Sequence, residues 1–421
     1  MSDIEVYVLD FERELDKSNF FLKFAILYGI FQELMKIGRH KLIGRIENSL
    51  NRYPVTLLLG PRQCGKTTIA KEILSRIGGT YFDLEDPETP LRPEIAKVVL
   101  HSLQGLIIID EFQRQPSLFP LLRVLADRDP LLSRFLILGS ASPDLVRGVS
   151  ESLAGRVTYV EMGGFKLDEV DPAQLNLLWV RGGFPRAYLA DDDRSSHDWR
   201  VNFIQTFLER DIPQLGIRIP AHAIRRFWTM VAHYHGQVWN AADFARSLGT
   251  KEDTARKYLD ILSGAFLVRQ LPPWFENVGK RLVKAPKVFV RDSGILHTLL
   301  ALTDLAQIQS HPKLGFSWEG FALEQVIGLT GADREVYFYK THGGAELDCL
   351  LIRDGKRHGF EFKYEDAPGS AKSSHIVFRD LKLDRLFVIY PGDRSYPIGE
   401  RAEVVPLSRL ESLLETHQLL H

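Results

Sequence analysis

Short apolar runs alternate with segments of helical spacing from residue 41 onward. Three runs, at residues 55–59, 106–109 and 135–138, each lead into polar residues, and residues 67–77 carry apolar side chains at helical intervals. Such short runs predict buried strands, and strands that alternate with helices predict a mostly parallel sheet covered on both faces. Ligands of such sheets bind at the carboxyl ends of the strands, where these polar residues lie. We therefore predict an α/β core over residues 41–165.

The pattern becomes helical after residue 165, and we predict a helical lid over residues 166–235. Two helices separated by a short turn, followed by two short strands, then predict a winged helix over residues 236–302. These four elements are expected at residues 240–248, 251–262, 266–270 and 287–290.

A second α/β unit is predicted over residues 317–421, after a linker at residues 303–316 that contains Pro312 and Gly315. A helix from Trp318 is followed by several segments of strand length. These segments are residues 336–339, 346–352, 359–363 and 385–389.

Residues 1–40 precede the core as an N-terminal extension. Their apolar segment, residues 20–31, contains Lys23 and is too short to span a membrane. We interpret it as an amphipathic helix that docks on the rest of the protein. Met35 is an alternative start, because the pattern of the core begins just after it.

The composition adds three constraints. The 421 residues suggest two or three domains, and a net charge of -1 means that a nucleic-acid partner would need a local basic face. The two cysteines, Cys64 and Cys349, cannot build a disulfide framework and indicate a reducing, cytoplasmic setting. No run of about 18 uncharged apolar residues is present, so we expect no membrane span.

A phosphate-binding loop is predicted where the first strand passes into the first helix. It consists of Gly60, Pro61, Arg62, Gln63, Cys64, Gly65, Lys66, Thr67 and Thr68. The first eight residues match G-x-x-x-x-G-K-[ST], in which backbone N–H groups and the positive end of the helix face the phosphates. Lys66 is expected to reach the β- and γ-phosphates and Thr67 to bind Mg²⁺. The predicted ligand is therefore a nucleotide with magnesium.

Two adjacent acids, Asp110 and Glu111, follow the apolar run at residues 106–109. A buried strand has no structural need for two carboxylates at its end. We therefore expect Asp110 to serve the magnesium and Glu111 to act as the base or positioner of the attacking water. The alternative is an ordinary turn at the end of a strand.

Two further residues are candidates for contact with the γ-phosphate. Ser140 follows the third strand and is expected to sense this phosphate, with Ser142 less favoured; a helix cap before Pro143 is the alternative. Arg156 is expected to stabilise charge in the transition state, within the chain or across the interface of a homo-oligomer. Its alternative is a surface pair with an acid, and Arg210 is the second candidate for the role.

These motifs resemble a prokaryotic AAA-type ATPase family over about residues 40–365. The patterns concerned are GPRQCGKTT, LIIIDEFQ, LGSAS with SLAGR, RGGFP at residues 181–185, LERDI at residues 208–212 and KVFVRDSGI at residues 287–295. The match is specific in the first half and looser after residue 300. The resemblance implies an AAA-like core that binds and hydrolyses ATP, and it does not define the biological process.

The C-terminal unit carries a second candidate site. Asp348 and Glu361 lie on two predicted strands joined by a hairpin turn at residues 354–355, and Lys363 shares a strand face with Glu361. Two carboxylates there can hold magnesium, with Glu319 of the preceding helix as a further ligand. Lys363 can then position a water or stabilise phosphate charge.

This order of residues resembles the PD-(D/E)xK nuclease pattern, and so implies a restriction-endonuclease-like domain. It departs from the pattern at Leu347, where a proline is expected before Asp348. Three interpretations stay open: a nuclease, a nuclease fold without activity, and a strand with solvent-facing acid and lysine residues.

Basic residues on the predicted winged helix favour DNA as a partner. They are Lys251, Arg256 and Lys257 on the expected recognition helix, and Lys280, Arg281 and Lys284 in the wing. Acids at residues 252, 253 and 260 share that helix. The leading hypothesis is an ATP-driven enzyme that acts on nucleic acid, with branched or broken DNA in genome maintenance or defence as one case. The alternative is a nucleotide switch that binds a protein partner without cleaving DNA.

Overall fold

The computed structural model describes residues 37–140, 152–214, 217, 219–275, 282–369 and 374–420. Contacts divide the chain into Met1–His40 and Lys41–His421, and the features below belong to the second unit. Predictions for residues 20–31, Met35, Ser142, Lys280 and Arg281 lie outside the described residues. Across the described ranges, every helix is too short or too polar to cross a membrane.

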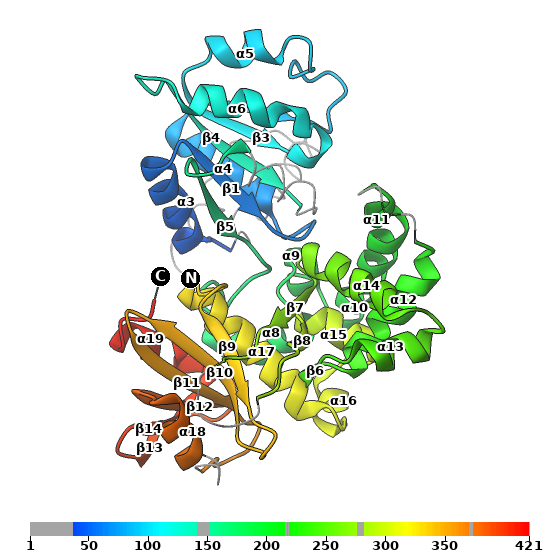
Figure 1. Cartoon of the computed structure of the whole chain (residues 1–421), viewed down its shortest axis with the longest axis vertical. Coiled ribbons are helices and arrows are strands. Elements are labelled where there is room, and N and C mark those ends of the chain that lie inside the picture. The colour runs from blue at the N-terminus through cyan, green and yellow to red at the C-terminus, as the bar shows by residue number, and fades with distance from the viewer. Residues whose placement is uncertain are drawn as a thin grey trace, which may run out of the picture. The chain divides into compact units, whose positions relative to one another are not determined.

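A five-stranded parallel sheet forms the first part of this unit (Figure 1). Its strands are β1 Val55–Leu59, β2 Thr80–Asp83, β3 Gly105–Asp110, β4 Ser133–Gly139 and β5 Val157–Glu161. The order is β2-β3-β4-β1-β5, and each neighbouring pair is parallel. The predicted parallel sheet is therefore confirmed, and the carboxyl ends of β1, β3 and β4 meet at one edge.

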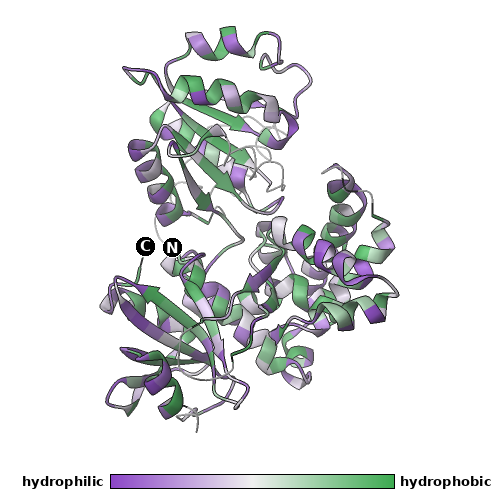
Figure 2. Ribbon diagram, viewed as in Figure 1, coloured by the Kyte–Doolittle hydropathy of each residue, from purple (hydrophilic) through white to green (hydrophobic). Residues whose placement is uncertain are grey.

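Helices cover both faces of this sheet because the residues of its central strands are apolar on both sides. The helices are α3 His40–Arg52, α4 Lys66–Ile77, α5 Ala96–Ser102 and α6 Phe119–Ala126, with 3-10 turns at Phe112–Arg114 and Pro116–Leu118. Leu57 and Ile107 pack with α5 and α6 in one hydrophobic cluster. Alternate residues such as Leu58 and Ile108 point to the other face, where α4 contacts β3 and β4. Figure 2 shows these strands in the green of hydrophobic residues.

Residues 172–233 are largely helical, as the pattern predicts. The elements are η4 Pro172–Gln174, α8 Leu175–Arg181, α9 Pro185–Tyr188, α10 Asp193–Thr206, the π-helical turn η5 Phe207–Asp211, α11 Ile212–Gln214 and α12 Ala221–His233. Their core is aromatic: the rings of Phe184 and Phe203 lie 4.7 Å apart, and those of Phe207 and Trp228 lie 5.6 Å apart. This packing fixes η5, whose last residue, Asp211, contacts the phosphate loop.

A small antiparallel sheet follows the helices. The elements are β6 Gln237–Val238, α13 Ala241–Leu248, α14 Glu252–Gly264, β7 Val268–Leu271 and β8 Lys287–Val290, and the strand order is β6-β8-β7. The side chain of Asn240 caps α13. The first expected strand begins two residues later than predicted, because Phe266 has a left-handed φ of 59°, which does not belong to an extended strand.

The linker predicted at residues 303–316 is wrong in part, because it contains helix. After α15 Ser293–Leu299, the chain forms α16 Leu305–Ser310, and α17 Leu314–Thr330 begins within the same stretch. Asp304 caps α16 by accepting the Gln307 N–H at 2.9 Å. α17 is buried on nearly all sides.

A six-stranded mixed sheet completes the chain. Its elements are β9 Val336–Lys340, β10 Glu346–Arg353, β11 Lys356–Phe362, α18 Ser374–Leu381, β12 Arg385–Tyr390, β13 Tyr396–Gly399, β14 Ala402–Pro406, η6 Leu407–Arg409 and α19 Leu410–Thr416. Strands β9, β10 and β11 are antiparallel neighbours, and β12 runs parallel to β11. The predicted hairpin is confirmed, with positive φ at both turn residues, Asp354 and Gly355.

Candidate functional site

The loop between β1 and α4 wraps around the side chain of Lys66. Gly65 has φ 101°, a left-handed conformation that favours glycine at the start of the helix. The buried Lys66 Nζ donates to the carbonyl oxygens of Gly60 at 2.9 Å and Pro61 at 2.8 Å. The ammonium group is thus held inside the loop, at the end of β1 where the motif predicts phosphate binding.

Asp110, the last residue of β3, lies directly across from this loop. Its Oδ2 accepts from Thr67 Oγ1 at 2.6 Å and from the Tyr81 hydroxyl at 2.9 Å. Burial and the nearby Asp110 raise the pKa of Tyr81, so Tyr81 stays a hydrogen-bond donor. A hydroxyl and a carboxylate are hard oxygen ligands of the kind that Mg²⁺ prefers, so the residues present fit the expected ion. The sequence did not identify Tyr81, which lies on an edge strand.

Glu111 has a strained backbone, with φ 53° and ψ 40°, values that are uncommon outside glycine. Its N–H donates to Asp110 Oδ1 at 2.8 Å, and its carboxylate accepts from the Gln113 amide. Arg62 Nη2 lies 3.9 Å from Glu111 Oε2. The carboxylate expected to serve the attacking water is therefore oriented by an amide and faces an arginine of the phosphate loop.

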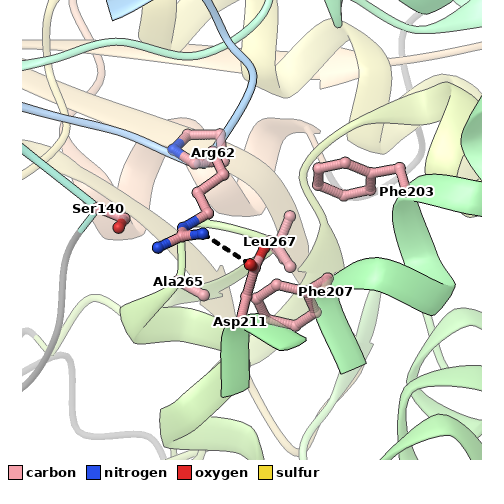
Figure 3. Close-up of a pocket in the computed structure, with 8 residues that line it drawn as sticks. Arg62, Ser140, Phe203, Phe207, Asp211, Ala265 and Leu267 are labelled. Atoms are coloured by element: carbon pink, nitrogen blue, oxygen red, sulfur yellow. Dashed lines mark hydrogen bonds and ion pairs between the residues drawn. The ribbon is translucent and has the colours of Figure 1, made fainter. Parts of the chain in front are cut away.

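The other end of the Arg62 guanidinium pairs with Asp211 of η5, with Nη1 donating to Oδ1 at 2.8 Å. Figure 3 shows Arg62 reaching to Asp211, with Phe207 beside them. Arg62, Phe207, Asp211 and Ser140 line one pocket. The buried hydroxyl of Ser140 has no hydrogen-bond partner among the described residues. Burial raises the pKa of Asp211, although Arg62 opposes this. Asp211 is the aspartate of LERDI, a motif whose contact with the loop could not be placed from the sequence.

Arg156 does not reach this site within the chain. It immediately precedes β5, and its carbonyl accepts from the N–H of Val55 at the start of β1, so it lies at the sheet edge opposite to the loop. The five residues of β1 therefore separate the backbone of Arg156 from the phosphate loop by roughly 16 Å. Its guanidinium pairs with Asp127, with Nη2 2.9 Å from Oδ2. Arg156 thus makes the surface pair with an acid that was its alternative, and a role in the transition state across an interface stays a prediction. Arg210, the second candidate for this role, is exposed, and its Nη2 lies 3.5 Å from Glu85 Oε1.

Two of the quoted motifs contact each other. Asp292 of the RDSGI segment accepts from the N–H of Gly183 at 2.8 Å and from the N–H of Ile295 at 2.9 Å. Gly182 has φ 78°, and a Cβ there would lie 2.2 Å from Asp292 Oδ1, so only glycine fits. The RGGFP motif is thus the contact surface for the aspartate that caps α15.

A buried ion network connects the parallel sheet with α17. Glu324 of α17 accepts from Arg269 and Arg291, and Lys166 Nζ lies 3.8 Å from its Oε2. Arg291 also pairs with Glu161, the last residue of β5. One arginine therefore bridges the strand beside β1 and the helix that carries Glu319.

The acids of the C-terminal unit surround a lysine that the sequence did not assign to this site. Lys287 Nζ lies 2.9 Å from Glu319 Oε1, 2.9 Å from Glu346 Oε1 and 3.6 Å from Asp348 Oδ1. Lys363 Nζ is 3.8 Å from Glu361 Oε2.

The magnesium set expected in this unit is not formed. Over the described ranges, no group of three or more His, Cys, Asp or Glu side chains is arranged to hold a metal ion. Burial raises the pKa of Glu319 to about 7, and burial together with Asp348 raises the pKa of Glu361 to about 7. Glu319, Asp348 and Glu361 are thus near one another without making a metal site, because a lysine ammonium contacts two of the three.

The phosphate loop, the acids at the end of β3 and the parallel sheet of order β2-β3-β4-β1-β5 define an AAA-type P-loop ATPase core. Three family models match the chain: AAA domain at residues 52–171, Domain of unknown function (DUF8612) at residues 172–306 and Domain of unknown function (DUF4143) at residues 314–410. The AAA match confirms the resemblance of the first part. The winged-helix and nuclease-like regions stay predictions.

The chain belongs to the same family as two mycobacterial proteins. Uncharacterized protein Mb2031c of Mycobacterium bovis and Uncharacterized protein Rv2008c of Mycobacterium tuberculosis are each 46% identical to it over 386 residues, which cover 92% of this chain and 87% of each relative. Among solved structures, the Walker-type ATPase PABY2304 of Pyrococcus abyssi is 15% identical, with a TM-score of 0.46; the match covers 63% of this chain and 96% of that one.

Proposed function

We propose that the chain binds ATP with Mg²⁺ at residues 60–68 and hydrolyses it. Lys66 exchanges its two loop carbonyls for phosphate oxygens, and Thr67 with Asp110 holds the magnesium, directly or through water. When bound, the ion neutralises charge on the phosphates. Glu111 orients the attacking water and accepts its proton, and the unpaired hydroxyl of Ser140 donates to the γ-phosphate.

The contact between Thr67 Oγ1 and Asp110 Oδ2, at 2.6 Å, carries this proposal. It joins the start of α4 to the end of β3 at the mouth of the loop, so that two oxygen ligands converge beside Lys66. Phosphate release by Thr67→Ala should fall to the background level at every magnesium concentration. Ser75→Ala, an exposed hydroxyl on the same helix, is the matched control and should keep the wild-type rate. A Thr67→Ala variant with wild-type turnover would sink the assignment.

We further propose that hydrolysis is coupled to nucleic acid through the winged helix predicted at residues 236–302, together with α12, which precedes it. Helix α12, strand β6, helices α13 and α14, and the strands β7 and β8 follow one another in the order of that fold, and the sheet order is β6-β8-β7. Lys251, Arg256 and Lys257 are exposed at the first turns of α14. Arg256 pairs with Glu252 at 3.1 Å, so a DNA phosphate must compete with that acid.

The test is the ATPase rate with single-stranded, duplex and junction DNA at moderate salt. We expect at least one of these DNAs to raise the rate, and Lys251→Ala with Lys257→Ala to remove the increase while the basal rate stays unchanged. The pair Lys41→Ala and Lys97→Ala, exposed lysines outside α14, serves as a control of equal charge. An ATPase rate that none of the three DNAs changes would contradict the coupling.

A second candidate function is a nucleotide switch that binds a protein partner. The C-terminal unit follows the order expected of a nuclease-like fold, with helix α17, the antiparallel strands β9 to β11, helix α18 and the parallel strand β12. The observation that favours the switch is that Lys287 lies among the acids of this unit. In this case wild type nicks no plasmid with Mn²⁺, and ATP changes only the assembly state seen by light scattering. Stimulation of hydrolysis by DNA would argue against the switch.

A further inference from the structure

Lys287 lies where three carboxylates converge, although it belongs to β8 and the acids belong to α17 and β10. Its side chain is 3% exposed, and its Nζ contacts Glu319 at 2.9 Å, Glu346 at 2.9 Å and Asp348 at 3.6 Å. An ammonium group has three N–H donors. Two of these donors can bond to Glu319 and Glu346, and Asp348 lies within ion-pair distance, which is the arrangement expected of a built-in counter-ion.

The second oxygens of two of these acids are also engaged by the protein. Glu346 Oε2 accepts from Lys340 Nζ at 2.6 Å, and Asp348 Oδ2 accepts from the N–H of Phe362 at 3.1 Å. Glu346 and Asp348 are two residues apart on β10, so they point to the same face. Glu346 Oε1 and Asp348 Oδ1 are therefore the oxygens that face Lys287, and a metal ion could bind the three acids there only in place of Lys287.

We propose that Lys287 is the resident cation of this acid cluster and that it closes the cluster to divalent metal ions. Buried carboxylates need a positive partner, because an isolated charge is very unfavourable away from water. The PD-(D/E)xK resemblance implies that a metal ion meets this need, whereas in this chain β8 supplies a lysine. A dication would be repelled by the ammonium group at this short range. The inference is independent of the proposed ATPase cycle, since no residue of the phosphate loop takes part.

Lys287→Met tests the proposal because methionine keeps an unbranched stem of similar length and removes the charge. Free Mn²⁺ is measured by electron paramagnetic resonance on the full chain without nucleotide. Any Mn²⁺ bound at the phosphate loop is then the same in all variants. Wild type should show no site of its own in the C-terminal unit, and Lys287→Met should bind one additional Mn²⁺ per chain.

Two further variants make the measurement specific. Lys340→Met removes a neighbouring lysine that contacts Glu346 at 2.6 Å and leaves Lys287 in place, so it should behave as wild type. Adding Asp348→Asn to Lys287→Met should abolish the additional Mn²⁺. If Lys287→Met does not fold, Lys287→Gln and Lys287→Arg replace it, and only the uncharged variant should gain a site.

The proposal is overturned by either of two results. One is a wild-type chain that binds Mn²⁺ at a site lost in Asp348→Asn, because the cluster would then be open in the presence of Lys287. The other is a Lys287→Met chain that unfolds in urea as a folded protein does, with its buried tryptophans as the reporter, yet binds no more Mn²⁺ than wild type. Lys287 would then be a structural partner of the acids whose removal opens no cation site.

Discussion

Glu324→Gln should destabilise the protein more than any single loss of a surface charge. The Glu324 side chain is 3% exposed and is the common partner of three cations. Arg269 and Arg291 each donate to its carboxylate, and Lys166 Nζ lies 3.8 Å away. Glutamine preserves the shape but removes the negative charge and turns an NH₂ group toward guanidinium groups. The three cations would then share a buried region without their central acid.

The expected loss in the free energy of unfolding depends on which acids the three cations retain. Removing one member of a buried ion network costs about 3–5 kcal/mol. Arg269 retains Asp333 at 3.2 Å, and Arg291 retains Glu161, so two of the cations keep one acid each. We therefore expect the lower end of that range, about 3 kcal/mol, which is roughly a hundredfold in the unfolding equilibrium.

The assay is urea denaturation followed by tryptophan fluorescence. Trp318 of α17 is fully buried, and its ring centroid lies 5.4 Å from that of Trp179, so its emission reports the loss of this packing. Glu335→Gln is the matched control: Glu335 pairs with Arg353 at 2.7 Å but is 47% exposed, and its loss should cost at most about 1 kcal/mol. Equal effects of the two substitutions would refute the central role of Glu324.

The pH dependence provides a second readout of the same variant. Burial alone would raise the pKa of Glu324, but Arg269, Arg291 and Lys166 hold it well below its ordinary value of 4.5. A carboxyl group with a lowered pKa in the folded state stabilises the protein above its unfolded pKa, and this contribution is lost as the pH falls. The stability difference between wild type and Glu324→Gln should be complete near neutral pH and shrink below about pH 4.5. A difference that grows in acid would contradict the reasoning.

Four further predictions concern the phosphate loop and assembly. Lys66→Ala should abolish turnover, and Glu111→Gln should keep ATP affinity while slowing phosphate release by about 10²–10⁴-fold, the usual contribution of a general base; wild-type release from Glu111→Gln would show that another group serves the water. Asp211→Asn should leave Arg62 to pair with Glu111 alone and lower kcat more than ATP affinity, so an unchanged kcat would exclude a role for this contact. If Arg156 acts across an interface, wild-type activity should fall on dilution and light scattering should show oligomers with ATP, whereas a fully active monomer at every dilution would exclude that role.

The apolar pattern predicted the central strands of the parallel sheet but not its edges. β1, β3 and β4 are buried on both faces and therefore appear in the sequence as short apolar runs. β2 and β5 are edge strands and contain partly exposed residues, such as Tyr81 and Thr158, so their sequences lack such runs. The contacts of Tyr81 with Asp110 could not be predicted for the same reason.

The two candidate sites differ in how far the sequence defines them. Lys66, Thr67 and Asp110 belong to local motifs in which a strand leads into a turn, and the structure places them together. Lys287 lies far from Asp348 along the chain, and its contact depends on the packing of β8 against the C-terminal unit. Local periodicity carries no information on such packing. The available signal was a lysine at the start of the otherwise apolar strand KVFV.

The contact of Asp292 with the glycines at residues 182–183 has a practical consequence for cutting the chain into recombinant fragments. A fragment that ends at residue 235 would present Gly183 without the carboxylate that accepts its N–H, and the complementary fragment would carry an acid deprived of that donor. A fragment over residues 172–306 retains both partners. In chimeras between relatives, the RGGFP and RDSGI segments should therefore be exchanged together, because a side chain at residue 182 in one parent would collide with an aspartate from the other.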